Sequence, residues 1–257
     1  LIFSCGKKEE VGDESNASSS TSTTSQCSSE TWSGTVQVGP MGDAVAGIVL
    51  DSSNNIFVAG HVKVALDDQT VTGGNDFFLQ KYNQSGIKQW TKVKGTSDYD
   101  QAYGLTIDSS NNLYIFGGYN GANNTNSDTT FVKYTSDGTF QSVFELDNSS
   151  ITFDGGSYLV VDSSGNIFTG GGKNVSKYNS SGVIQWQDNQ TSGQGIVLGS
   201  EGNIYAVANG VRTTKYKDNG TSQWTKTLSS SGNDQVEGVA IDSANNIYIT
   251  GQTSGGL

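Results

Sequence analysis

Acidic and amide side chains crowd a short segment that could bind a metal ion. Residues 51–55 read DSSNN, and a calcium loop of the EF-hand kind needs oxygen ligands at alternate positions. Asp51 and Asn55 fit its first and fifth positions, but Ile56 stands where it requires glycine, and Val62 stands where it requires glutamate. The segment is therefore predicted to be a turn between two strands.

Enzymatic chemistry has few candidate groups in this chain. His61 is the only histidine, so a Ser-His-Asp triad has one possible centre, and a metal site made of several histidines is impossible. Paired carboxylates for glycoside chemistry remain conceivable, although no spacing favours them. We therefore expect no catalysis.

The DSSNN segment returns along the chain, which indicates the elements that hold these residues. Related segments begin at residues 108, 162, 199 and 242, and each follows a short apolar run. Asp at a turn start accepts bonds from backbone N–H groups, and Asn or Gly tolerates the left-handed conformation. Each copy is therefore predicted to be a hairpin.

A second repeat follows each hairpin. Lys-Tyr pairs occur at 81–82, 133–134, 177–178 and 215–216, each with a Gly four residues after the Tyr. A Trp follows the Tyr by eight at 90, 186 and 224, whereas Ser142 takes that place once. Units of about 40 to 50 residues with four strands are typical of a β-propeller. We expect an all-β propeller of four-stranded antiparallel blades, with Tyr and Trp packed between blades and the lysines keeping strand surfaces polar.

These motifs together resemble the bacterial SBBP β-propeller repeat family. The pattern runs from the Asp-Ser-Ser-Asn-Asn turn through Phe-x-x-Lys-Tyr to Ser-Gly-x-x-x-Trp, and the resemblance covers residues 31–257. It implies a fold rather than an activity. The streptogramin-lyase-like propellers rely on histidines that this chain lacks. About four and a half blades are expected here, with a C-terminal truncation of a ring of six or seven.

The net charge of the chain limits the classes of macromolecule that it can bind. The chain has 14 Lys and Arg against 25 Asp and Glu, for a formal charge of −11, and Arg212 is its only arginine. Nucleic-acid binding needs a basic surface, so we expect no nucleic-acid partner.

The first residues resemble the end of a bacterial lipoprotein signal. Residues 1–5 read LIFSC, and the resemblance implies lipidation of Cys5. Residues 6–30 are polar and rich in Ser and Thr, which predicts a flexible tether and leaves Cys27 without a partner in the chain. We expect a lipid-anchored protein of the bacterial cell envelope, at the outer membrane or cell surface.

Two long segments fall on one face of the predicted propeller. Residues 61–76 and 119–128 connect second to third strands, and the matching segments of the later blades are much shorter. Function often resides on long, variable loops of a rigid scaffold. The candidate partner-binding residues are His61, Asp67, Asp68, Asp76, Tyr119, Asn120, Asn123 and Asn124.

Four aspartates recur just before the first strand of a blade, on the same face. They are Asp43, Asp100, Asp154 and Asp234. Such a ring could bind Ca²⁺ through oxygen ligands, but we favour the alternative that each Asp caps its own turn. No other cofactor is expected.

We accordingly expect a non-catalytic surface lipoprotein that binds a protein or glycan through its long loops. One alternative is a propeller hydrolase or lyase that uses these four aspartates, which would line the central funnel of the propeller. Another alternative is a purely structural display scaffold.

Overall fold

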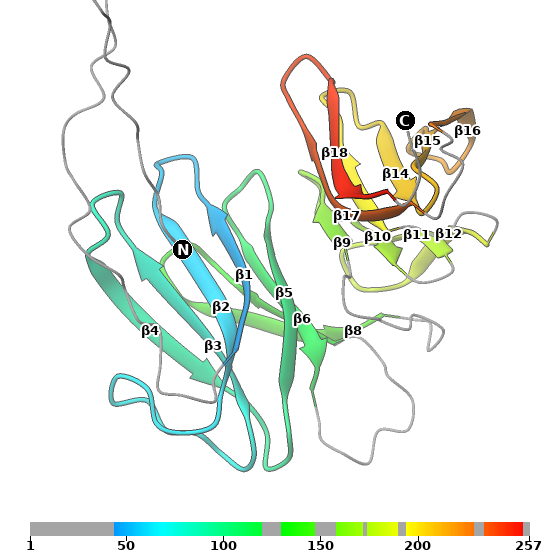
Figure 1. Ribbon diagram of the computed structural model, residues 1–257. Helices are drawn as coiled ribbons and strands as arrows, with labels where there is room; N and C mark the ends of the chain where they lie inside the picture. The colour runs from blue at the N-terminus through cyan, green and yellow to red at the C-terminus, as the bar shows by residue number, and fades with distance from the viewer. Residues whose placement is uncertain are drawn as a thin grey trace, which may run out of the picture.

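Antiparallel β-strands make up the regular secondary structure of the computed structural model, which describes residues 44–119, 130–146, 158–171, 174–189, 194–228 and 234–253 (Figure 1). The first sheet consists of β1 (Ala44–Leu50), β2 (Ile56–Val62), β3 (Asp76–Tyr82) and β4 (Lys88–Lys94). The second consists of β5 (Gln101–Ile107), β6 (Leu113–Gly118), β7 (Thr130–Tyr134) and β8 (Phe140–Glu145).

Three further sheets follow in the same order. The third consists of β9 (Tyr158–Val161), β10 (Ile167–Gly171), β11 (Asn174–Tyr178) and β12 (Ile184–Asp188). The fourth consists of β13 (Gly195–Leu198), β14 (Ile204–Ala208), β15 (Arg212–Tyr216) and β16 (Ser222–Thr227). The fifth, within the described residues, is the pair β17 (Gln235–Ile241) and β18 (Ile247–Gln252).

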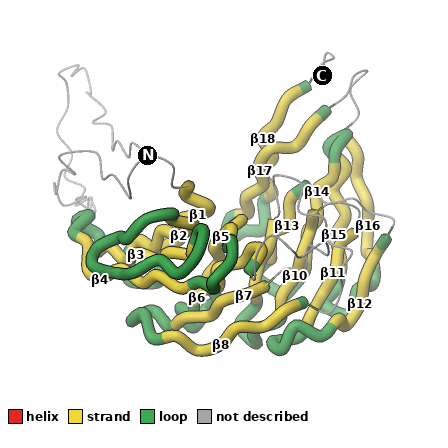
Figure 2. The backbone as a smooth tube through the Cα atoms, turned by 90° about the horizontal axis from the view of Figure 1, so that it is seen from below, coloured by secondary structure: helices red, strands yellow, loops and turns green. Residues whose placement is uncertain are grey.

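The sheets follow one another as the blades of an open propeller, and we number them blades 1 to 5. Each is an antiparallel meander, and the first strands contact one another in the order β1, β5, β9, β13, β17. The blades form an arc in Figure 2, with β1 near one end and β17–β18 at the other, and the described sheets do not close a ring. The predicted fold class is confirmed.

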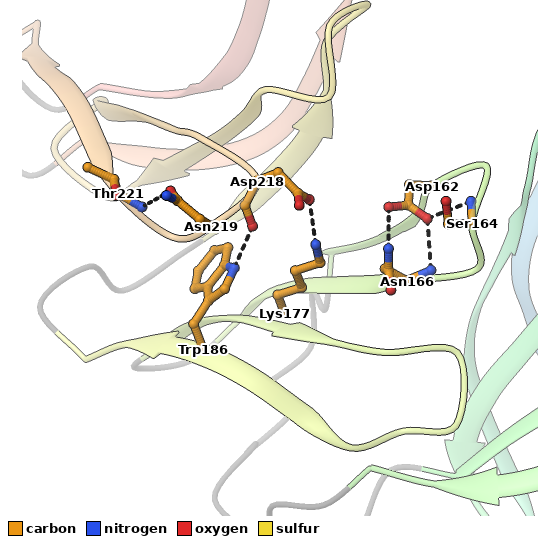
Figure 3. Close-up of polar contacts among 8 residues, drawn as sticks. All are labelled: Asp162, Ser164, Asn166, Lys177, Trp186, Asp218, Asn219 and Thr221. Carbon is orange, nitrogen blue, oxygen red and sulfur yellow. Dashed lines mark hydrogen bonds and ion pairs between the residues drawn. The ribbon is translucent and has the colours of Figure 1, made fainter.

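Four of the five described hairpin turns are held by the aspartate that opens them, and Gly199 takes that place in blade 4. Asp51 Oδ1 accepts hydrogen bonds from the backbone N–H groups of Ser53 (2.8 Å) and Asn55 (2.9 Å), while Asn54 adopts a φ of 59°. The same pattern surrounds Asp108, Asp162 and Asp242, and Figure 3 shows the copy at Asp162. The prediction of a turn is confirmed, since the carboxylate accepts hydrogen bonds from backbone N–H groups of the turn.

Burial is greatest in the middle strands of the blades. All seven residues of β2 are buried. Blade 2 packs against one face of the strand, and the other face packs against residues of blade 1 itself, among them Leu66 of the β2–β3 loop. One apolar cluster joins Phe57 and Leu79 of blade 1 to Leu105 and Ile115 of blade 2. The repeated tyrosines are buried, as predicted: Tyr82, Tyr134, Tyr178 and Tyr216.

The repeated lysines do more than keep strand surfaces polar, which corrects the expectation. Lys81 pairs with Phe57 on one side and Trp90 on the other, and its Nζ lies 5.1 Å from the Phe57 ring centroid. The same Nζ donates a hydrogen bond of 3.0 Å to the carbonyl of Ser136 in the next blade. Lys133, Lys177 and Lys215 also lie over aromatic rings of their own blades.

Two of the repeated tryptophans, Trp90 and Trp186, pack against the next blade. Trp186 of blade 3 lies beneath Gly220 of blade 4, where an added β-carbon would come within 2.7 Å of the indole. Its Nε1 donates a hydrogen bond of 2.8 Å to the Asp218 carbonyl, and Lys177 forms a 2.5 Å ion pair with the Asp218 carboxylate (Figure 3). The Lys and Trp of the repeat therefore join one blade to the hairpin of the next.

Candidate partner-binding face

Two loops of blade 1 meet at one end of the first two sheets. Residues 63–75 connect β2 to β3, and residues 95–100 cross from β4 to β5. The Gly74 N–H donates to the Asp98 carbonyl (2.8 Å), and the Asp100 N–H donates to the Asn75 carbonyl (2.8 Å). We call these two loops together the long-loop face, which lies at the lower end of blades 1 and 2 in Figure 1.

Asp67 fastens the longer loop to the sheet. Its Oδ2 accepts hydrogen bonds from Lys88 Nζ (2.5 Å), Thr91 Oγ1 (2.5 Å) and Gln80 Nε2 (3.2 Å). The hydrogen bonds from Lys88 and Thr91 lower the pKa of Asp67, despite partial burial. Leu66, beside it, is buried in an apolar cluster. The predicted binding residue Asp67 is thus an anchor of the loop.

Two predicted contact residues are buried, and the expectation for them needs correction. His61 is only 8% exposed because it lies on β2 between β1 and β3, and Asp76 is 1% exposed at the start of β3. The prediction placed both on a loop, whereas β2 and β3 extend further than the sequence pattern indicated. Asp68 is exposed, with a φ of 62°.

Tyr119 lies at the edge of the described residues and packs inward. Its ring centroid is 5.5 Å from that of Phe77. Burial raises the pKa of Tyr119, and the nearby carboxylates of Asp100 and Asp76 raise it further, so the hydroxyl stays protonated. The predicted residues Asn120, Asn123 and Asn124 lie outside the described residues.

Two of the four aspartates predicted to line the central funnel, Asp100 and Asp234, lie within the described residues. Asp100 is fully buried and its Oδ2 accepts a 2.6 Å hydrogen bond from the Thr96 backbone N–H, which is the predicted capping of its own turn. Asp234 is 6% exposed, and Asp43 and Asp154 lie outside the described residues. Among the residues that the structure describes, no three His, Cys, Asp or Glu side chains gather as a metal site.

Two exposed tyrosines, one in the crossover loop of this face and one on the adjoining strand β5, were missed by the sequence reasoning. Tyr99 is 48% exposed in the crossover loop and Tyr103 is 41% exposed on β5. A signal was available for Tyr103, which departs from the repeat. Aligned on the aspartate before the first strand, its position holds Ala46, Ser157 or Glu237 in blades 1, 3 and 5, whereas the Tyr99 position holds Gly42, Phe153 or Asn233.

The predicted anchor cannot be followed in the structure. Cys5, Cys27 and the rest of residues 1–43 lie outside the described part. In that part, no helix has the length and apolar character needed to cross a membrane.

Comparison with known families supports the repeat. Residues 223–257, which include β17 and β18, match the SBBP family, described as a β-propeller repeat. The search of curated proteins gave no match.

Solved structures with a similar fold are distant in sequence. A Bacteroides caccae protein of unknown function has a TM-score of 0.52 and 10% identity, covering 79% of this chain and 65% of that one. This chain thus spans just under two thirds of that protein's length. An inactive variant of virginiamycin B lyase from Staphylococcus aureus, solved with quinupristin, has a TM-score of 0.48 and 13% identity, covering 81% and 70%. At such identities the SBBP repeat and the first of these structures support the propeller fold, and no shared activity follows.

Proposed function

We propose that this SBBP-repeat protein is a surface-anchored, non-catalytic β-propeller that binds a protein or glycan partner through its long-loop face. The observation that carries the proposal is the exposure of Tyr99 and Tyr103 beside a firmly held loop. Tyrosine supplies a large contact area at little entropic cost, and binding loops are rich in Tyr, Ser, Gly and Asn.

The rigidity of the loop supports the same proposal. Asp67 and the hydrogen bonds of Gly74 and Asp100 hold the face in one arrangement before any partner arrives. Binding by a preorganised surface loses less conformational entropy than binding by a mobile one. The acidic charge of the chain favours a partner other than nucleic acid.

Cell-envelope anchoring through Cys5 belongs to the proposal and rests on the sequence pattern of residues 1–5. Several lipid chains hold a protein firmly at a membrane, whereas one chain holds only weakly. The Ser- and Thr-rich residues 6–30 would then place the face clear of the membrane surface.

The double substitution Tyr99→Ala, Tyr103→Ala tests the proposal on an array of glycans and purified envelope proteins. Binding to the partner identified there should weaken at least tenfold, because interface aromatics often carry much of the binding energy. Deletion of residues 63–73 should abolish the same binding while unfolding stays cooperative. The control is Tyr248→Ala, which removes a tyrosine that is 57% exposed in blade 5. Unchanged affinity of the double variant would refute the assignment of this face.

A further inference from the structure

Two carboxylates from neighbouring blades converge at the base of the long-loop face. Asp76 begins β3 of blade 1, and Asp100 immediately precedes β5 of blade 2. A β-carbon added to Gly95 would overlap Oδ1 of Asp76 and would lie 2.7 Å from Oδ2 of Asp100. Both oxygens therefore pack against the same side of the Gly95 Cα, and their approach to each other there requires glycine at position 95.

One oxygen in this space lacks a protein partner. Asp76 Oδ2 accepts a 2.8 Å hydrogen bond from the Thr72 N–H, but Oδ1 is buried and has no hydrogen-bond partner. A buried carboxylate oxygen without a partner is costly, since water no longer solvates it. The unpaired oxygen points to a ligand that supplies positive charge.

We propose that Asp76 and Asp100 together bind a calcium ion between blades 1 and 2. Carboxylate, carbonyl and hydroxyl oxygens are the ligands that Ca²⁺ takes, and its flexible coordination suits a site completed by water. Further oxygens are close, because the Tyr119 hydroxyl lies 3.5 Å from the Gly95 carbonyl oxygen. The ion would fasten the β2–β3 loop to the crossover, and its binding does not depend on the proposed partner.

In the absence of an ion, the two carboxyls act on each other. Burial raises the pKa of Asp76, and the charge of Asp100 raises it further, while the hydrogen bond from Thr72 opposes the change. Two ionised carboxylates that pack against the same glycine repel each other. A divalent cation would remove that repulsion.

Thermal unfolding of the whole chain with CaCl₂ or with a chelator tests the site. A ligand bound only by the folded state raises the melting midpoint, by roughly 5 °C at a hundredfold excess over its Kd for a chain of this size. Equilibrium dialysis with CaCl₂ should find one tightly bound ion per chain. Failure of the wild-type protein to gain stability or bind the ion would overturn the proposal.

Asp76→Asn is the decisive variant, and Asp98→Asn is its matched control. Asp98 is exposed in the same crossover, two residues before Asp100. The calcium-induced rise should vanish in Asp76→Asn and persist in Asp98→Asn. In chelator, Asp76→Asn should melt at or above the wild-type midpoint, because the repulsion is gone.

Two outcomes would overturn the site, and neither requires the variant to be fully stable. A calcium shift that persists in Asp76→Asn would place the ion elsewhere on this acidic protein. No calcium shift in the wild type, together with a stabilised Asp76→Asn in every buffer, would mean that the two carboxyls share a proton instead. If Asp76→Asn fails to fold, dialysis of Asp100→Asn answers the same question, with loss of the bound ion as the expected result.

Discussion

The junction between blades 1 and 2 and the junction between blades 2 and 3 come from the same repeat but are held by different contacts. At the first, Lys81 donates to the Ser136 carbonyl and Trp90 packs against Gly138. Asn111 of blade 2 also reaches back to Ser52 of blade 1 through two hydrogen bonds, of 3.1 and 3.2 Å. Polar and aromatic contacts of the repeat therefore join these two blades.

The second junction has neither the tryptophan nor the asparagine. Ser142 stands at the tryptophan position, and Gly165 stands where Asn111 stands in blade 2. An apolar cluster joins the blades here, as another does at the first junction, but without those contacts: Phe131 and Phe144 stack at 5.2 Å and pack near Leu159 and Tyr178 of blade 3. Blade 3 still forms four strands. The Lys, Trp and Asn positions of the repeat therefore act mainly between blades.

Among the substitutions that test this comparison, Trp186→Ala, at the junction of blades 3 and 4, should change the free energy of unfolding most. The substitution removes a half-buried indole stacked on Tyr216 and the hydrogen bond to the Asp218 carbonyl. The free energy of unfolding in urea should fall by about 2–3 kcal/mol, less than for a fully buried tryptophan. Gln185→Ala, an exposed neighbour on β12, is the control and should change it by less than about 0.5 kcal/mol.

Ser142→Ala gives the matching measurement at the junction of blades 2 and 3. Ser142 occupies the tryptophan position but is too small to reach the next hairpin, so its loss should cost less than about 0.5 kcal/mol. A loss as large as that of Trp186→Ala would show that the two junctions do not differ in the way described.

Much of the fold was predictable because it is local. Asp51, Asn54 and their repeats specify turns through bonds to their own backbone, and alternating apolar runs specify the strands between them. Periodicity of these short segments was therefore enough to predict four-stranded blades. It also predicted that Tyr82 and its counterparts would be buried.

The site was less predictable because it depends on contacts between blades. The sequence pattern treated Asp76 as an exposed loop residue, yet it begins a strand and faces Asp100, which belongs to another blade. Tyr99 and Tyr103 carry no motif, and only Tyr103 departs from the residue types of the other copies, since Phe153 stands at the Tyr99 position. A repeat reveals what its copies share, whereas a binding face depends on where one copy differs.

A smaller effect should follow from Asn111→Gly at the junction of blades 1 and 2. Glycine accepts the φ of 63° found there, so the substitution mainly removes the two hydrogen bonds to Ser52. The free energy of unfolding should fall by about 1 kcal/mol. Asn54→Gly is the matched control, since Asn54 has a similar φ of 59° and no blade before it within the described residues. Equal losses at both sites would assign the role of Asn111 to its own turn.

The smallest effect is expected within a blade, at Asp51. Partial burial would raise the pKa of this carboxyl, but hydrogen bonds from Asn55 and Ser53 outweigh it, and the pKa is lowered overall. Because the folded pKa lies below the unfolded one, the ionised carboxylate stabilises the fold above about pH 4, and this contribution is lost as the pH falls through the folded pKa. Asp51→Asn keeps an acceptor oxygen and loses the charge, so we expect a loss of about 0.5 kcal/mol at pH 7 that shrinks towards pH 2. Urea unfolding at both pH values measures it. A loss that stays constant with pH would mean that the turn needs the shape of aspartate rather than its charge.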